Sequence, residues 1–189
     1  IIVQSGVMLG TMVKEAIHKQ ICGLESLVGV PGTVGGALIM NAGAFGGEIS
    51  NYFIEAKTMT LKGDIKTYSK KDVQFEYRHS TFPIDEILID ATFKYKKGDP
   101  NKIFKDRKIA SQGRKLTQPL KFRSAGSIFK NPSKKLAAGY LIDQVGLKGT
   151  NYGGASISEK HANFIVNLGN ATASDVFHLI LLARQKVAE

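Results

Sequence analysis

Tryptophan is absent from the 189-residue sequence, cysteine occurs once, and long apolar runs are missing. The single cysteine, Cys22, excludes an internal disulfide bond. Because it has no C-x-x-C partner, we expect a small, buried apolar side chain in a reducing, cytoplasmic setting. No stretch approaches the roughly 18 uninterrupted apolar residues of a membrane-spanning helix. The histidines lack the spacing of zinc ligands; they are His18, His79, His161 and His178. These absences predict a protein with no membrane partner and no metal.

Acidic residues are comparatively few, with 16 Asp and Glu against 26 Lys and Arg and a formal net charge of +10. A positive field of this size favours anionic partners. Nucleic acid is one such partner, but the aromatic residues are not interleaved with basic ones as they are on a base-stacking platform. A small polyanionic ligand explains the charge equally well, and plain solubility is a third explanation. We expect no nucleic-acid binding.

The standard nucleotide fingerprints, G-x-x-x-x-G-K-[ST] and G-x-G-x-x-G after a strand, are also absent. Eight of the twenty glycines nevertheless lie within residues 23–47. Pro31-Gly32 predicts a tight turn, and Thr33 predicts the N-cap of a short helix that Asn41 and Gly43 close. Unpaired N–H groups at a glycine-rich turn and helix N-terminus suit a phosphate or pyrophosphate. The alternative is that these glycines only let helix and sheet pack closely.

Apolar periodicity and capping signals predict a chain that mixes helices and strands, in an α+β fold. The expected helices cover residues 8–17, 100–116, 136–145 and a last segment that begins with a Thr172/Asp175 capping box. The expected strands cover residues 53–61 and 65–68, joined as a hairpin, and residues 86–95 and 163–167. In the third strand, alternation predicts one shared face for Ile87, Ile89, Ala91, Phe93 and Tyr95. The segment 75–83 has no clean period.

Residues 96–100 have the composition of a linker, Lys-Lys-Gly-Asp-Pro. We therefore expect two domains, residues 1–97 and 98–189. Asp99 is the expected N-cap, and Pro100 the expected first residue, of the basic helix that follows.

Two side chains stand out as candidates for chemistry. Ser127 directly follows a glycine in SAGSIFKNP, where a turn could present its hydroxyl as a proton donor beside Lys130 and Asn131. No G-x-S-x-G pattern surrounds it, so it is a poor hydrolytic nucleophile. Arg78 follows Tyr77 in the unassigned segment and could bind a carboxylate or phosphate. Taken singly, Ser127 could equally be a turn serine and Arg78 a surface arginine.

Five segments in this order and spacing resemble the UDP-N-acetylenolpyruvoylglucosamine reductase family. They read GLESLVGVPGTVGGALIMNAGAFGGEI, FEYRHSTF, RSAGSIFKNP, AAGYLIDQVGLKG and GGASISEKHANFIVN, and the similarity covers nearly the whole chain. The resemblance implies that residues 1–97 are the second subdomain of a vanillyl-alcohol-oxidase-type FAD-binding domain. It implies that residues 98–189 are a smaller α+β substrate-binding domain. The lack of a long tyrosine-bearing insertion implies the family's shorter subtype.

The resemblance also implies an activity, namely reduction of UDP-N-acetylglucosamine enolpyruvate to UDP-N-acetylmuramate for peptidoglycan synthesis. In the family, NADPH reduces FAD, and a hydride then passes from the flavin to the enolpyruvyl double bond. Three polyanionic ligands would account for the charge of +10. We expect a cytoplasmic monomer.

By the same resemblance, Ser127 would protonate the carbon next to the one that receives the hydride, and Arg78 would stabilise the enolate-like intermediate. The implied flavin and pyrophosphate contacts are Gly29, Val30, Pro31, Gly32, Thr33, Gly35, Gly36, Asn41, Ala42 and Gly43. The implied substrate contacts are Tyr77, Arg114, Gln118, Lys130 and Asn131.

Two parts of the family pattern have no match in this sequence. One is an N-terminal subdomain with another glycine-rich FAD motif, and the other is a catalytic glutamate beyond the last helix, whose motif Glu189 does not fit. The resemblance therefore predicts an incomplete enzyme that binds FAD weakly or not at all. The alternative is a catalytically incomplete fragment that acts only as a UDP-sugar/flavin-binding module.

Overall fold

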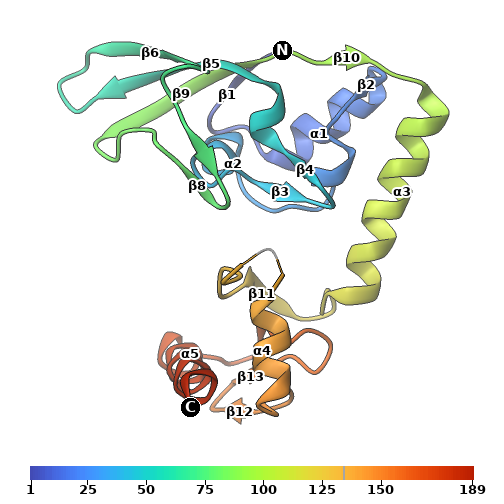
Figure 1. Ribbon diagram of the computed structural model, residues 1–189, viewed down its shortest axis with the longest axis vertical. Coiled ribbons are helices and arrows are strands. Elements are labelled where there is room, and N and C mark those ends of the chain that lie inside the picture. The colour runs from blue at the N-terminus through green and yellow to red at the C-terminus, as the bar shows by residue number, and fades with distance from the viewer. Residues whose placement is uncertain (134) are drawn as a thin grey trace. The chain divides into compact units, whose positions relative to one another are not determined.

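The computed structural model describes residues 1–133 and 135–189 (Figure 1). The chain forms two compact units, residues 1–112 and residues 113–189, called here the first and the second unit. Each has its own sheet and its own buried apolar cluster. The expected boundary between the flavin domain and the substrate domain, at residues 97 and 98, stays a prediction.

The first unit is built on a four-stranded antiparallel sheet in the order β1-β9-β5-β6. Its longer strands are β1 (Ile2–Gln4), β5 (Phe53–Thr60), β6 (Ile65–Ser69) and β9 (Glu86–Phe93). Its two-residue strands are β2 (Ile21–Cys22), β3 (Gly43–Ala44), β4 (Gly47–Glu48), β7 (Phe75–Glu76), β8 (His79–Ser80) and β10 (Lys96–Lys97). Its α-helices are α1 (Leu9–His18), α2 (Val34–Ile39) and most of α3 (Pro100–Thr117), and its 3₁₀ turns are η1 (Glu25–Leu27) and η2 (Ile49–Tyr52).

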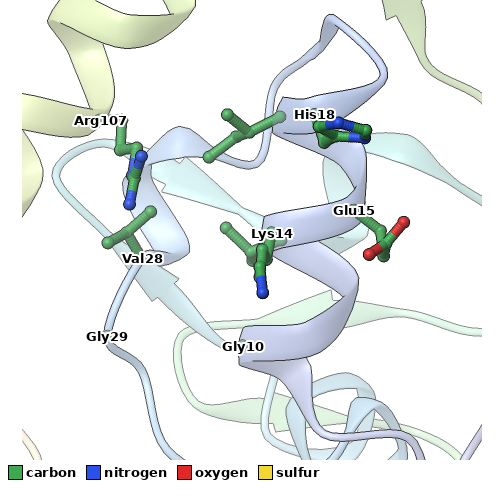
Figure 2. A pocket seen from close by; sticks show the side chains of 9 residues that line it. Gly10, Lys14, Glu15, His18, Val28, Gly29 and Arg107 are labelled. Atoms are coloured by element: carbon green, nitrogen blue, oxygen red, sulfur yellow. The ribbon is translucent and has the colours of Figure 1, made fainter.

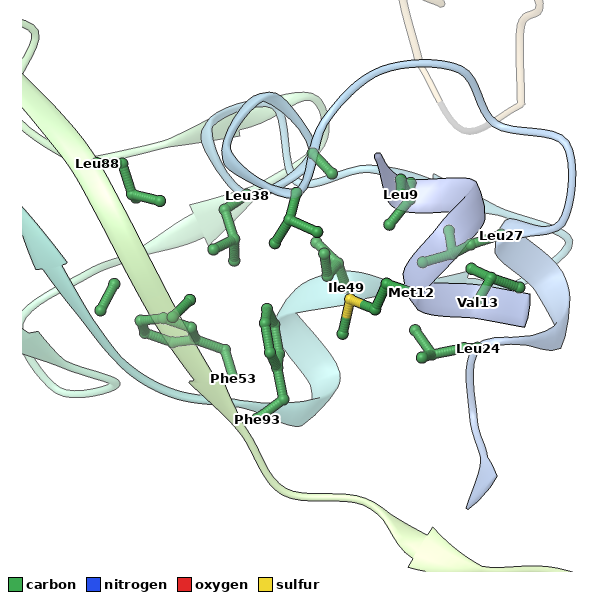
Figure 3. Close-up of a cluster of buried hydrophobic side chains, with 14 of the residues drawn as sticks. Leu9, Met12, Val13, Leu24, Leu27, Leu38, Ile49, Phe53, Leu88 and Phe93 are labelled. Atoms are coloured by element: carbon green, nitrogen blue, oxygen red, sulfur yellow. The ribbon is translucent and has the colours of Figure 1, made fainter. Parts of the chain in front are cut away.

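The first core lies where α1 and α2 pack against the sheet (Figure 3). The predicted helix over residues 8–17 is confirmed as α1, which buries Leu9, Met12, Val13 and Ala16 because they share one face at helical spacing. Phe53 of β5 and Phe93 of β9 are each almost fully buried in the same cluster. The sheet and α1 thereby hold the glycine-rich stretch that runs between them in sequence.

The predicted alternation along the strand that became β9 is wrong at one end. Ala91 and Phe93 are buried as expected, but Ile87 is 53% exposed and Leu88 is buried. The register explains this difference, since Lys57 pairs with Asp90 while the next residue of β5 pairs with Leu88. One extra residue in β9 exchanges the two faces of the strand, as a β-bulge does.

The segment expected as a free linker is tied to the first unit. Lys96 and Lys97 form β10, which pairs with Ile21 and Cys22 of β2. Cys22 is half-buried there, not fully buried as predicted. The basic helix is confirmed as α3; it starts at Pro100, and the Asp99 carboxylate accepts the N–H of Asn101.

The second unit is a four-stranded antiparallel sheet in the order β11-β14-β13-β12 with two helices. The elements are β11 (Arg123–Ser127), α4 (Ala138–Gln144), β12 (Asn151–Tyr152), β13 (Ala155–Ile157), β14 (Phe164–Asn167) and α5 (Ala173–Ala188). The Thr172/Asp175 capping box at the start of α5 is confirmed. Leu179 and Ala183 of α5 are buried against residues of β13 and β14. Among the described residues, no helix is long and apolar enough to cross a membrane.

Candidate functional site

The short helix predicted in the glycine-rich stretch is α2, and its caps are those expected. The Thr33 hydroxyl accepts the N–H of Gly36 at 3.3 Å, which makes Thr33 the N-cap. Asn41 follows the helix with φ of 41°, a left-handed conformation that Asn adopts more readily than most residues. Local sequence signals therefore suffice to start and stop α2.

Unpaired N–H groups were predicted at the glycine-rich turn and at the helix N-terminus, but among the described residues the structure has them only in the loop before α2. The N–H of Val34 donates to the Val7 carbonyl at 2.8 Å, and that of Gly35 donates to the Ser5 carbonyl at 2.9 Å. The turn between β1 and α1 covers the start of α2 and uses the donors that a free helix end would offer. Within the described chain, no hydrogen bond is made by the N–H groups of Gly29, Gly32 and Thr33.

The glycines divide into two classes. An added Cβ at Gly35 would come within 2.9 Å of the Ser5 Cβ, and one at Gly43 within 2.8 Å of the Glu48 Cγ, so these two permit close packing. Gly32 differs, because it is exposed with φ of +110° and an added Cβ would meet nothing within 4 Å. The glycines of this stretch therefore serve both expected purposes. Gly35 and Gly43 permit close packing, and Gly32 leaves the backbone open to a ligand.

A cavity of ≈ 520 Å³ adjoins this loop (Figure 2). Gly29 lines it together with Val28, the α1 side chains of Lys14 and His18, and Arg107 of α3. Lys14 and Arg107 give the cavity a positive charge, while Glu15 on α1 partly offsets it. The cavity can accept an anionic group next to the free N–H of Gly29.

Arg78 lies in a tight hairpin that periodicity did not predict. β7 and β8 pair antiparallel, with Tyr77 and Arg78 as the two connecting residues. Arg78 has φ of 55°, a conformation in which hairpin turns usually place Asn or Gly, so the usual sequence signal is absent. Its guanidinium donates from Nη2 to the Gly43 carbonyl at 2.8 Å and lies 5.0 Å from the centroid of the Tyr77 ring. The structure thus brings Arg78 and Tyr77 to the end of the glycine-rich stretch.

Asn41 connects this hairpin to the glycine-rich stretch. Its Nδ2 donates to the Glu48 carboxylate and to the Glu76 carbonyl, both at 3.0 Å. The side chain is fully buried, and its Oδ1 has no hydrogen-bond partner among the residues that the structure describes. With no exposed surface, the side chain here serves to hold Glu76 and Glu48 in place. Val30 and Ala42, also expected at the flavin, are partly buried against the first core.

Ser127 was predicted to lie on a turn, but it lies at the end of a strand. It is the last residue of β11 and pairs with Phe164 of β14. The register shifts between Ser124 and Ser127, and Gly126 has φ of +85°, so the glycine forms a bulge inside the strand. Ser127 is exposed.

The residues after Ser127 are held by contacts that the sequence did not reveal. The Asn163 amide bonds both the N–H and the carbonyl of Phe129. Asn131 accepts the N–H of Ala138 at 3.1 Å, which helps to cap α4, and Lys130 is exposed. Ser127, Lys130 and Asn131 lie on one segment, which these contacts hold in place.

Arg114 and Gln118 lie at the end of α3 and just beyond it. The N–H of Gln118 donates to the Arg114 carbonyl at 2.8 Å. Burial lowers the pKa of the Arg114 guanidinium, which is partly covered. The neighbouring Lys115 carbonyl accepts the Lys160 ammonium at 2.6 Å, so the turn before β14 is tied to the end of this helix.

Family models match two parts of the chain. Residues 118–189 match the model described as UDP-N-acetylenolpyruvoylglucosamine reductase, C-terminal domain, and residues 1–69 match the one described as FAD binding domain. These matches confirm the α+β fold class and a FAD-binding part followed by the C-terminal domain of the reductase.

Curated relatives carry the same description. The chain is 44% identical over 178 residues to the UDP-N-acetylenolpyruvoylglucosamine reductase of Streptococcus uberis, which covers 94% of this chain and 58% of that protein. It is 42% identical over 189 residues to the reductase of Enterococcus faecalis, covering 100% of this chain and 63% of that protein. The chain therefore spans about three fifths of the length of these relatives.

A crystal structure titled UDP-N-acetylenolpyruvylglucosamine reductase (MurB) from Thermus caldophilus superimposes with a TM-score of 0.91 and 38% sequence identity. The match covers 98% of this chain and 68% of that one. Agreement in both domain models, in sequence and in structure leads to one conclusion: the chain belongs to the UDP-N-acetylenolpyruvoylglucosamine reductase family.

Proposed function

We propose that this chain supplies the flavin-facing and substrate-facing residues of an enzyme that reduces UDP-N-acetylglucosamine enolpyruvate to UDP-N-acetylmuramate. FAD would be its cofactor and NADPH its reductant, in the peptidoglycan pathway of the cytoplasm. One observation carries the proposal. Arg78 and the segment of Ser127, which are suited to charge and proton handling, are each held by hydrogen bonds in a chain that matches a reductase over its whole length.

FAD fits the residues of the first unit. The N–H groups of Gly29, Gly32 and Thr33 are free for the pyrophosphate, and Gly32 leaves its backbone open to close approach. The cationic side chains of Lys14 and Arg107 add a favourable field at the adjoining cavity. When bound, FAD supplies the hydride that the substrate double bond accepts, after NADPH has reduced it.

Ser127 is the proposed proton donor. Hydride addition to one carbon of the double bond leaves a carbanionic, enolate-like neighbour that needs one proton. The Ser127 hydroxyl gives that proton from Oγ and regains one from solvent, which its exposure allows.

Arg78 is the proposed charge stabiliser. Negative charge builds on the substrate carboxylate as the hydride arrives, and a guanidinium fixed in advance stabilises it without reorganisation. The hydrogen bond from Nη2 to the Gly43 carbonyl supplies that fixation. Tyr77, Arg114, Gln118, Lys130 and Asn131 are the proposed substrate contacts, and residues 1–97 and 98–189 the proposed flavin and substrate domains.

The test uses the complete product of the gene. We expect it to retain flavin absorbance after desalting, to lose the oxidised flavin spectrum anaerobically with NADPH, and to regain it on addition of UDP-N-acetylglucosamine enolpyruvate. UDP-N-acetylglucosamine, which lacks the enolpyruvyl group, is the control and should not restore the spectrum. Flavin reoxidation by both sugars, or by neither, would contradict the proposed reaction. We also propose that the protein is a monomer, which sedimentation of the same sample checks.

A second candidate is a binding module without redox activity. The chain spans 58% of the length of the Streptococcus uberis reductase, so this candidate is tested on the 189-residue chain. An experiment on the 189-residue chain distinguishes the two candidates. Flavin retained after desalting supports a flavin site formed by these residues alone. Flavin lost on desalting, with a UDP-sugar still bound in equilibrium dialysis, supports the module.

A further inference from the structure

We propose that Asn163 is a positioning residue for Ser127, and that its side-chain amide replaces one rung of the β-ladder that the strand itself cannot supply. This inference rests on the proposed function of Ser127. Asn163 precedes β14 in a turn and is only 4% exposed. Its side chain is buried, so its influence on Ser127 must pass through the segment that it holds.

The backbone pairing between β11 and β14 ends just where the site begins. Ser127 pairs with Phe164, and the Ile128 N–H then donates to the main-chain carbonyl of Asn163 at 2.9 Å. Beyond this point the backbone before Asn163 turns away from β11, so among the described residues no main-chain partner remains for Phe129. A segment released here would leave Ser127 at the frayed end of a strand.

The Asn163 side chain continues the ladder. Its Oδ1 accepts the Phe129 N–H at 2.9 Å, and its Nδ2 donates to the Phe129 carbonyl at 2.8 Å. A primary amide carries an acceptor oxygen and two N–H donors, one of them on the same side as the oxygen, so it can satisfy both. Neither Asp, which has no donor when ionised, nor Ala reproduces this pair of bonds.

Asn163 is itself held from the other side. Its N–H donates to Nδ1 of His161 at 3.2 Å. At Gly139 in the first turn of α4, an added Cβ would lie 3.0 Å from the His161 ring and 3.5 Å from the Asn163 Cβ, so the helix packs closely on both. We call the pair of hydrogen bonds between the Asn163 amide and Phe129 the clamp. It connects the His161 turn and α4 to the segment of Ser127. Because the Asn163 amide is buried and makes two hydrogen bonds, it restricts the conformations of the segment that carries Ser127.

The test compares Asn163→Asp with Asn167→Asp in the complete gene product. Asn167 is the matched control because its Oδ1 accepts the N–H groups of Gly169 and Ala171. A carboxylate at this position keeps both bonds. For Asn163→Asp at neutral pH we expect flavin reduction by NADPH within about twofold of wild type. We expect reoxidation at saturating enolpyruvyl substrate to be at least tenfold slower. Asn167→Asp should stay within twofold of wild type in both steps.

Acidification should rescue the first variant and not the second. A protonated carboxyl has an O–H donor and a C=O acceptor, like the amide, so the reoxidation rate of Asn163→Asp should approach the wild-type rate as pH falls. The charged and titratable groups around the introduced carboxyl are His161 in the preceding turn, Lys148 near it and Lys130 on the clamped segment. Wild type at each pH corrects for their titration.

Hydrogen exchange at the Phe129 amide tests the clamp without any assay of catalysis. We expect slow exchange in wild type and at least tenfold faster exchange in Asn163→Ala, which removes the Oδ1 acceptor, with Ile128 unchanged because its bond goes to a main-chain carbonyl. Fast exchange at Phe129 in wild type would overturn the proposal, even if no variant at this position folds.

Equal slowing of both half-reactions in Asn163→Asp, or none, would also overturn it. If Ser127→Ala reoxidises at the wild-type rate while Phe129 is protected by Asn163, the proposed role of Ser127 fails and the clamp alone survives.

Discussion

The two units hold their proposed functional groups in different ways. In the first unit the side chain of Arg78 is itself anchored, by its bond to the Gly43 carbonyl. In the second unit Ser127 has an exposed side chain, and the anchoring is through the backbone: Ser127 pairs with Phe164, and Asn163 holds Phe129. The difference matches the proposed chemistry. A charge stabiliser works best when it is fixed in advance, whereas a proton donor must exchange its proton with solvent.

The largest expected effect is that of Ser127→Ala in the complete gene product. Removing the donor should slow substrate-dependent flavin reoxidation about a thousandfold, within the range for general acid catalysis. Flavin reduction by NADPH should stay unchanged. Rapid-mixing absorbance measurements of the two half-reactions check this. Equal loss in both would show that Ser127 supports folding or flavin binding, and would remove the comparison between the two units.

Arg78→Lys should slow the same half-reaction about a hundredfold, because Lys keeps the charge but not the planar fork that reaches the Gly43 carbonyl. The readout is again the reoxidation rate, now as a function of substrate concentration. An unchanged reoxidation rate would mean that a positive charge alone stabilises the intermediate. Anchoring of the side chain would then not be the feature that distinguishes the first unit.

Neighbouring glycines on α2 provide a sharper contrast within the first unit. Gly35→Ala should destabilise the 189-residue chain by about 1–3 kcal/mol, because the new methyl group would lie 2.9 Å from the Ser5 Cβ. Gly36→Ala meets only the Thr33 hydroxyl, at 3.7 Å, and should stabilise it by about 0.5–1 kcal/mol, as expected for Ala in a helix. Urea unfolding without FAD measures both. The same sign for the two variants would contradict the division into packing and open glycines.

The smallest expected effect is a difference in the acid sensitivity of the units. Burial, with a smaller contribution from Lys148, lowers the pKa of His161 below its usual 6.5. The unfolded state therefore takes up a proton first, and the second unit loses stability as pH falls from about 6.5 towards the lowered pKa. In the first unit, hydrogen bonds from Lys66 and Thr58 lower the pKa of Glu86. Its contribution is present above the usual glutamate pKa and is lost only below about 4.3.

Amide exchange in α5 and β5 as a function of pH measures the two units separately. His161→Gln should remove the earlier loss in α5 and leave β5 unchanged. Simultaneous loss of protection in both elements near pH 6 would contradict independent titration of the two cores.

Local signals explain which parts of the fold could be predicted. The Thr172/Asp175 capping box and the Thr33 N-cap act within three residues, and both are confirmed. Helical spacing likewise predicted α1, because its buried face repeats along one short segment. The exposed end of β9 could not be predicted, since a bulge against β5 changes which residues face the core.

The sequence alone determined the family, the fold class and the identity of the candidate residues, because motifs, caps and periodicity are encoded over short distances. Only the tertiary structure decided how those residues are held. Arg78 meets a carbonyl 35 residues away, and Asn163 clamps a segment 34 residues away. Ser5 and Val7 take the donors of Gly35 and Val34 in α2. These contacts depend on how distant segments pack, and no local pattern in the sequence specifies which distant donor and acceptor will meet.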